Sequence, residues 1–179
     1  ERVYINPSLV FMAGKKTKIF VEGDFLSDKR TLDNGTGAVN YEIADVPRNR
    51  FLGAAWSYNK LQQQSATVTI THDLNSKWKL TSTSSYQGYN SELFGTTRPN
   101  ASSQFVKEDG TWARGLQKSK NNEKYYITQL DLTGNFKTGK ICHTFLMGAD
   151  ADQYNTDVNA FAYANAAIGN KNVYDTINI

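Results

Sequence analysis

The chain has 179 residues, of which 39% are hydrophobic and 21% are charged, and its formal net charge is +3. This length suits one domain, and the mild, scattered positive charge gives no indication of a nucleic-acid partner. The single Cys142 excludes an intrachain disulfide, and two histidines with one cysteine do not make a zinc site.

Hydropathy leaves the choice between water and lipid open. No stretch approaches about 18 consecutive apolar residues, so the sequence predicts no transmembrane helix. A membrane-spanning β-strand needs only about 9 to 11 residues with one apolar face, and the mean hydropathy of −0.56 is compatible with either solvent. The chain opens on "ERVYINPSLVF", which is strand-like, so we expect any export signal to lie outside this sequence.

The periodicity predicts an antiparallel meander of about six strands and no helix. The first strand spans 2–12 and turns at 13–16 into a second over 17–30. The third, near 60–72, alternates apolar residues with threonines, turns at 73–76 and returns as the fourth. Long polar stretches, about 31–56 and 93–122, separate these hairpins from the last one.

The last hairpin, "QLDLTGNFKTGKICHTFLMGAD" (129–150), shows two different faces. Successive side chains of a strand point to opposite sides, so Leu130 and Leu132 share one face while Gln129 and Asp131 share the other. The returning arm is less one-sided; the set that contains Phe145 is the favoured apolar face.

Loop lengths favour a membrane barrel over a soluble sheet. The short turns near residues 14, 74 and 138 all fall at one end of the sheet, and the long polar loops fall at the other. This layout is typical of outer-membrane barrels and unusual in soluble domains. Aromatic residues form two predicted belts: Phe11, Trp78 and Phe136 near the turns, and Tyr86, Tyr89, Tyr125, Tyr126 and Tyr154 towards the loops. Alternatively, these aromatics fill the core of a soluble sandwich.

Four stretches carry a family resemblance: "RVYINPSLVF", "DVPRNRFLG", "THDLNSKWKLTSTSSYQGY" and the last hairpin. In that order and near that spacing they resemble the barrel of TonB-dependent siderophore receptors of the ferrichrome type. The resemblance implies a transmembrane barrel of about 22 strands that imports a ferric siderophore across a Gram-negative outer membrane. It also implies that residues 1–179 form a partial barrel domain, with the plug domain and the TonB box that contacts the TonB complex outside this sequence.

The resemblance further suggests ligand-binding residues. Phe94 in "NSELFG" and Phe161 in "DVNAFAY" resemble positions where the family has vestibule aromatics. Tyr41 in "GAVNYE" is a looser match, and Tyr163 is added because it lies near Phe161. Aromatic rings with a few polar partners suit a ferric hydroxamate, although "GTT" follows Phe94 where the family often has a second aromatic. Alternatively, these rings only pack the loops together.

Basic residues of the second long stretch are candidates for contact with lipopolysaccharide, or for a solvated loop: Lys107, Arg114, Lys118, Lys120 and Lys124. No nucleophile with a base and no metal set stands out, so we expect neither an enzyme nor a cofactor, with iron present only within the ligand. Two other functions stay open: a non-transporting porin or adhesin, and a soluble β-domain that binds carbohydrate or protein.

Overall fold

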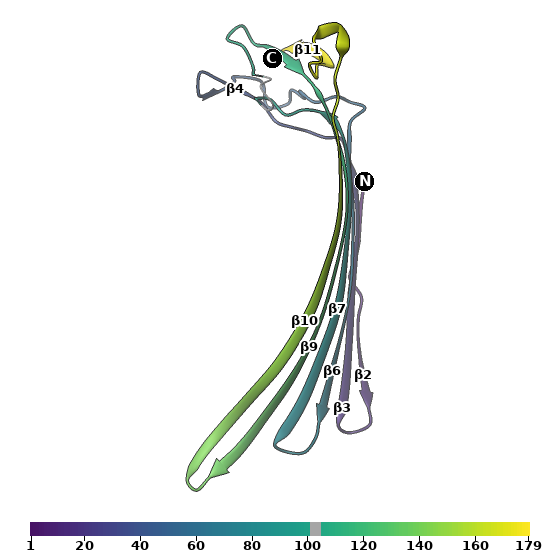
Figure 1. Cartoon of the computed structure of the whole chain (residues 1–179), viewed down its shortest axis with the longest axis vertical. Coiled ribbons are helices and arrows are strands. Elements are labelled where there is room, and N and C mark those ends of the chain that lie inside the picture. Colours follow the sequence, from purple (N-terminus) through teal and green to yellow (C-terminus); the bar gives the residue numbers. More distant parts are fainter. Residues whose placement is uncertain (101–104) are drawn as a thin grey trace.

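One long, curved antiparallel sheet makes up most of the molecule (Figure 1). The computed structural model describes residues 1–100 and 105–179. The sheet runs in the order β1, β3, β6, β7, β9, β10, with β2 also paired to β3, and this confirms the predicted all-β meander. Its strands are β1 (Arg2–Ile5), β2 (Ser8–Ala13), β3 (Thr17–Arg30), β6 (Tyr58–Asp73), β7 (Trp78–Thr96), β9 (Leu116–Thr138) and β10 (Ile141–Phe161).

The short turns lie together at one end of the sheet, as predicted (Figure 1). Two of them, between β2 and β3 and between β9 and β10, contain a glycine with positive φ: Gly14 at 74° and Gly139 at 60°. Only glycine adopts this conformation without a steric cost, which explains the tight reversals.

The predicted first strand is interrupted between β1 and β2, at Asn6 and Pro7. Proline has no backbone N–H to donate to a ladder. The neighbouring strand compensates, because the Gly23 backbone amide donates to the Pro7 carbonyl at 3.0 Å and the Asn6 side-chain amide donates to the Gly23 carbonyl at 3.0 Å. Both segments keep the same register on β3, so they act as one edge strand.

The register gives the sheet one apolar and one polar face. Opposite residues of paired strands point to the same side. Ile19 lies opposite Ile70, and Leu132 lies between Leu80 and Met147. These residues define the apolar face, which confirms the predicted side of both arms of the last hairpin. The polar face, on the other side of the sheet, contains Thr67, Thr83, Gln129, Asp131 and Asp150.

A loop cap, comprising residues 31–57, 97–100, 105–115 and 162–179, lies at the other end of the sheet. It contains the hairpin β4 (Ala38–Val39) and β5 (Glu42–Ile43), the 3-10 turn Ala166–Ile168, and β8 (Thr111–Arg114) paired with β11 (Asp175–Asn178). Figure 1 shows that the cap leans towards the side to which the sheet curves.

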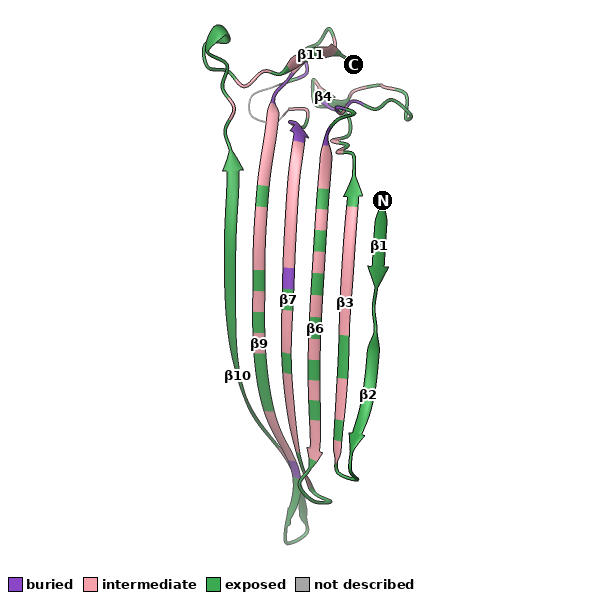
Figure 2. Ribbon diagram, turned by 90° about the vertical axis from the view of Figure 1, so that its right-hand side faces the viewer, coloured by how far each residue is buried: buried purple, intermediate pink, exposed green. Residues whose placement is uncertain are grey.

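The buried hydrophobic cluster belongs to this cap rather than to the sheet. Leu52, Val106 and Trp112 form it, and Trp112 is only 1% exposed. In Figure 2 the inner strands are half-buried along most of their length, whereas β1, β2 and β10 are exposed almost throughout. The sheet is therefore a single layer whose faces require partners outside this chain. Within the part of the chain that the structure describes, no helix has the length and apolar character needed to cross a bilayer.

Candidate functional site at the long-loop end

Aromatic rings border the apolar face at two heights. Tyr86 and Tyr126 lie opposite each other on β7 and β9, with ring centroids 5.0 Å apart. Towards the turns, the centroids of Trp78 and Phe145 are 5.8 Å apart. The lower border extends to Phe136, which stacks on His143 two residues nearer the turn than Gly134, the residue opposite Trp78 and Phe145. Ten residues of β9 separate Phe136 from Tyr126; at about 3.3 Å per residue and a strand tilt of about 40°, this corresponds to a band about 25 Å tall. The band matches the apolar thickness of an outer-membrane barrel.

The predicted upper belt is correct for Tyr86 and Tyr126 only. Tyr89, Tyr125 and Tyr154 point to the polar face, because they have the opposite strand parity. There the rings of Tyr125 and Tyr154 lie 6.5 Å apart, and the Tyr154 hydroxyl donates to Glu123 Oε2 at 2.7 Å.

Hydroxyl and carboxylate groups line the polar face. Thr67 and Ser85 hydrogen bond across β6 and β7 at 2.8 Å, and the Ser65 hydroxyl donates to Asp24 on β3. The Gln129 side chain donates to Asp131 at 2.9 Å. A face this polar suits water or a polar partner rather than lipid, so the sequence-based assignment of Gln129 and Asp131 to the polar side is confirmed.

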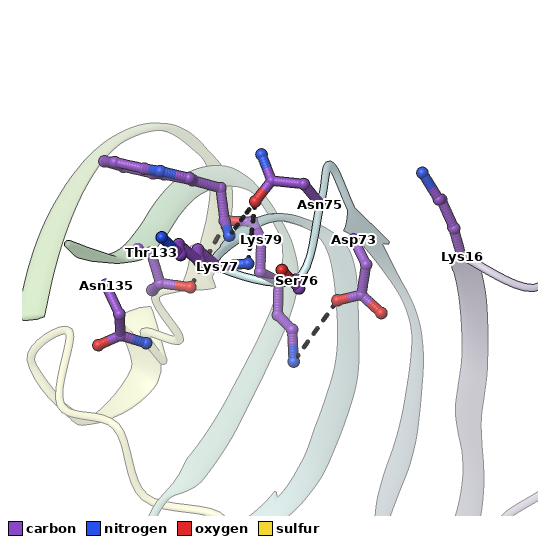
Figure 3. Close-up of a pocket in the computed structure, with 10 residues that line it drawn as sticks. Lys16, Asp73, Asn75, Ser76, Lys77, Lys79, Thr133 and Asn135 are labelled. Atoms are coloured by element: carbon purple, nitrogen blue, oxygen red, sulfur yellow. Dashed lines mark hydrogen bonds and ion pairs between the residues drawn. The ribbon is translucent and has the colours of Figure 1, made fainter.

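A hollow of about 640 Å³ lies between the short turns (Figure 3). Asn75 Oδ1 accepts hydrogen bonds from the amides of Lys77 and Trp78, at 2.9 and 3.1 Å, and so fixes the turn. Lys79 Nζ lies 3.9 Å from Asp73 Oδ1, and both side chains are about half exposed. Such an exposed pair contributes little to stability. None of the predicted ligand residues lines this hollow. We therefore interpret it as a consequence of how the short turns pack and not as a ligand site.

Gly134 lets the Trp78 ring lie flat on β9. A Cβ at Gly134 would come within 2.2 Å of that ring, so we expect Gly134→Ala to displace the indole and to destabilise the fold by about 1–3 kcal/mol. Tryptophan fluorescence and urea unfolding in lipid vesicles measure both effects. In a Trp78→Ala background the same substitution should cost much less; an equal cost would contradict the packing argument.

The buried side chain of Arg114 links the segments of the cap. The Arg114 side chain is 8% exposed and forms a two-pronged ion pair with Asp175, in which Nε donates to Oδ1 at 2.7 Å. Its Nη1 also donates to the carbonyls of Leu52 and Gly53, at 2.8 and 3.1 Å. Arg114 therefore joins three segments of the cap and is not the lipopolysaccharide contact considered from the sequence.

Three of the four predicted ligand residues are brought together. The Phe94 and Tyr163 rings stack with centroids 6.2 Å apart, and Lys118 Nζ lies 5.7 Å from the Phe94 centroid and 4.8 Å from that of Phe161. Tyr41 lies apart from them, at the tip of the β4–β5 hairpin, with φ of 68° and a fully exposed side chain.

Sequence reasoning missed several members of this group. The Trp56 ring lies 5.0 Å from Phe94 and 5.5 Å from Tyr174, and the Trp56 indole donates to the Tyr174 hydroxyl at 3.0 Å. Tyr58 packs edge-on against Phe94 at 6.2 Å. The rim aromatic cluster is therefore Trp56, Tyr58, Phe94, Phe161, Tyr163 and Tyr174. Tyr58 and Phe94 face each other through strand register, which no local motif in the sequence reveals.

The register also fixes the side on which two of the predicted residues lie. Phe94 is opposite Lys118, and Lys118 is opposite Phe161, in one row of the apolar face above the Tyr86–Tyr126 pair. The cluster therefore continues the apolar face beyond its tyrosine border. If Phe94 and Phe161 contact a ligand, as predicted, the ligand must reach the rim aromatic cluster from the loop end of the sheet.

A second hollow, of about 660 Å³, lies where the upper strands meet the cap. Leu93, Gln117 and Ala160 line it from the polar face, and Lys118 and Phe161 line it from the apolar face. Asn34, Arg98 and Tyr163 line it from the cap. It thus combines apolar, amide and cationic groups at the loop end, which is the mixture that small-molecule sites use. Among the residues described, no three His, Cys, Asp or Glu side chains are grouped to hold a metal ion.

Comparison with known proteins identifies relatives among receptors. No family model matches the chain. The metal-pseudopaline receptor CntO of Pseudomonas aeruginosa is 31% identical over 88% of this chain and 22% of its own length. A probable TonB-dependent siderophore receptor, PiuA of Acinetobacter baumannii, is 26% identical over 90% of this chain and 22% of its own length. The chain thus spans about a fifth of the length of these relatives.

Solved structures share the fold. The crystal structure of the siderophore receptor PiuA from Acinetobacter baumannii superposes with a TM-score of 0.75 and 21% identity, over 97% of this chain and 26% of that one. BauA, the ferric preacinetobactin receptor of the same species, superposes with a TM-score of 0.77 and 14% identity, over 99% and 26%.

These matches correct one expectation and support another. The relatives bear the names of pseudopaline, preacinetobactin and other siderophore receptors, so the ferrichrome type expected from the sequence is not supported. All of them are receptors, in agreement with the expectation that the chain is not an enzyme. Sequence and fold together support the TonB-dependent siderophore receptor family, with this chain corresponding to a segment of the receptor barrel.

Proposed function

We propose that the chain forms part of the wall of an outer-membrane receptor that binds a metal-loaded siderophore and imports it with energy supplied through TonB. The observation that carries this proposal is the apolar band of about 25 Å between two aromatic borders, on a sheet with all its short turns at one end. The similarity to CntO and PiuA supports the siderophore part.

A sheet of this kind requires a larger barrel. It ends at β1 and β2 on one side and at β10 on the other. Backbone groups of a sheet edge cannot be satisfied by lipid, so both edges need strand partners. We propose that the remaining strands belong to the same receptor and that its plug occupies the lumen on the polar face. The TonB complex would then act on that part of the receptor, outside this sequence.

The substrate class is a siderophore complex, with the metal as cargo rather than cofactor. The names of the sequence relatives favour a pseudopaline-like chelate over ferrichrome. A ferric hydroxamate remains the alternative that the sequence motifs suggested. A non-transporting porin or adhesin is the second candidate, favoured by the same apolar band but not by these names.

Growth of a receptor-deletion strain tests the proposal. The complete gene should restore growth on a metal siderophore as sole iron source, and deletion of tonB should abolish this growth. Ferrichrome, a catecholate and the siderophores of the relatives should be supplied separately, which identifies the substrate class. Restored growth without TonB, or diffusion of unrelated solutes through the barrel, would contradict the receptor proposal and favour the porin.

Tyr41 lies at the tip of the β4–β5 hairpin, which Figure 1 shows on the side of the cap towards which the sheet curves. Because its ring is fully exposed, Tyr41→Ala should leave unfolding unchanged. We expect the variant to weaken siderophore binding to the complete receptor by about 10-fold, since a buried ring contact contributes on the order of 1–2 kcal/mol. Equilibrium binding measures this change.

Variants of the rim aromatic cluster provide a comparison with Tyr41→Ala. Phe94→Ala, Phe161→Ala and Tyr163→Ala should weaken binding similarly if these rings contact the ligand. Each should lower only the stability of the cap if the rings pack against one another. Unchanged affinity in all four variants would remove the predicted ligand set.

A further inference from the structure

Lysines are concentrated at the short-turn end of the sheet. The segments 13–18, 73–79 and 137–141 contain seven lysines, all exposed, and a single carboxylate, Asp73. This end therefore has a formal charge of +6, whereas the whole chain has +3, so the remaining residues together carry −3. The turns thus form a positively charged end on a chain that is otherwise slightly negative.

These lysines fall into two sets. Lys18, Lys79 and Lys137 have the strand parity of the polar face, where Asp73 pairs with Lys79. The other four lie in the turns, beyond the strand ladders, and we name them the turn lysines: Lys15, Lys16, Lys77 and Lys140. No turn lysine has an ion pair within the described part of the chain. Figure 3 shows the Lys16 side chain pointing away from the pair of Lys79 and Asp73.

The apolar face ends at its lower aromatic border, next to the turn lysines. Lys77 adjoins Trp78, and Lys140 lies four residues beyond Phe136. Phe11 borders the first turn on the same face. Interfacial aromatic residues mark the level at which the hydrocarbon of a bilayer gives way to lipid headgroups. The turn lysines therefore lie at the level of the headgroups.

The outward side of the turn end suits an anionic lipid surface. In the described strands of the sheet, the carboxylates on the apolar face are Glu92 and Asp157, and both lie at the opposite, long-loop end. Apolar side chains are exposed among the turn lysines: Leu74 is 45% exposed and Ile141 is 63% exposed. A lysine can lay its methylene stem along such apolar surface while its ammonium group reaches the headgroups.

We propose that the turn lysines bind the phosphate groups of anionic phospholipids, of the phosphatidylglycerol type, in the periplasmic leaflet of the outer membrane. Each ammonium group donates charge-assisted hydrogen bonds to phosphate oxygens. The exposed Leu74 and Ile141 favour a lipid surface over a dissolved anion or an acidic soluble protein. The proposal rests on the proposed function only in requiring that the barrel lie in the outer membrane with its short turns on the periplasmic side.

The test reads lipid contact next to Trp78. The complete receptor is reconstituted in phosphatidylcholine vesicles that contain either dibrominated phosphatidylglycerol or dibrominated phosphatidylcholine. Bromine quenches a nearby indole, and the difference between receptors with and without Trp78→Phe isolates the signal of Trp78. Because Trp78 adjoins Lys77, this signal reports on the turn end alone. Vesicles with identical leaflets make the result independent of the direction of insertion.

Two triple variants are matched in charge and in height. The test variant removes one lysine from each turn: Lys15→Gln/Lys77→Gln/Lys140→Gln. The control removes one lysine from the strand beside each turn, on the polar face: Lys18→Gln/Lys79→Gln/Lys137→Gln. Heat-modifiable migration on gels verifies that both variants fold as barrels.

We expect phosphatidylglycerol to occupy the sites next to Trp78 roughly fivefold in preference to phosphatidylcholine, because a basic residue near an anionic surface contributes about this factor. The test variant should reduce this preference to nearly one, and the control should retain it. High salt should also remove it from the wild type, a measurement that needs no variant. Equal quenching by the two lipids in the wild type would overturn the proposal.

Three other results would also overturn it. The test variant could keep the wild-type preference, which would mean that the turn lysines do not contact the headgroups. The control could lose as much as the test variant, which would indicate a general attraction to this end. Millimolar inorganic phosphate could abolish the preference, which would indicate a site for a free anion.

Quenching is measured without siderophore and without TonB. A receptor with the lysine-dependent lipid preference that fails to support growth would contradict the proposed transport function alone. A receptor that imports the siderophore but shows no such preference would contradict the lipid contact alone.

Discussion

Leu132→Arg should lower the free energy of unfolding in lipid by about 2–4 kcal/mol, the cost of a cation near the middle of a bilayer. Leu132 lies between Leu80 and Met147, six residues of β9 from Tyr126 and four from Phe136, near the middle of the apolar band. Because the substitution keeps the strand position and changes only polarity, the cost reports the solvent that this face meets. Urea titration of the complete barrel in lipid vesicles measures it.

Asp131→Asn is the matched control on the neighbouring residue. The Asp131 carboxylate points to the polar face, where it accepts hydrogen bonds from Gln129. Asparagine keeps an acceptor there, so we expect a change within about 0.5 kcal/mol. Equal tolerance of the two substitutions would mean that the apolar face does not meet lipid. A large cost at Asp131 with none at Leu132 would reverse the assignment of the faces.

Strand pairing was predictable from the sequence because lipid imposes a simple alternation. Within the band, neighbouring residues such as Leu130 and Gln129 differ sharply in polarity. The sequence therefore indicates both the face to which each residue points and the positions of the turns. The turns themselves are short and contain Gly14 and Gly139, and these signals are local.

The upper ends of the strands were not predictable for the converse reason. β9 begins at Leu116, whereas the sequence suggested a polar loop up to about residue 122, and β10 extends as far as Phe161. Above the membrane both faces of a strand meet water, and the apolar alternation disappears. The strands continue because their backbone ladder continues, and the same absence of alternation concealed the facing of Lys118 and Lys120.

Loop packing was hidden for a different reason. β8 pairs with β11 across about 60 residues, and Trp112 meets Leu52 from another loop. No periodic pattern links such short segments. The candidate site was therefore predictable only as single aromatics: Phe94, Phe161 and Tyr163 come together, but Trp56 and Tyr58 join them through contacts that depend on the fold.

Arg114→Met should open the loop cap while leaving the barrel wall folded. The guanidinium is buried against Asp175 and two backbone carbonyls, so its removal leaves Asp175 without its cation and the Leu52 and Gly53 carbonyls without their donor. Removing one partner of a fully buried pair costs about 3–5 kcal/mol; because the Asp175 side chain is 34% exposed, we expect a cost at or below the lower end of this range. Because the contacts are confined to the cap, we expect faster hydrogen exchange in residues 105–115 and 175–178, with exchange in β6 and β7 unchanged.

Two further variants separate charge from shape at this position. Arg114→Lys keeps the charge but cannot form the two-pronged contact or reach both carbonyls, so we expect an intermediate effect. Arg98→Met removes an exposed arginine from the same cap and should change little. If Arg114→Met left cap exchange unchanged, the ion pair would not fasten the loops. If Arg114→Met unfolded the whole sheet, the cap and the barrel wall would form one cooperative unit. Any movement of the loops on ligand binding would then strain the strands that carry Phe94 and Lys118.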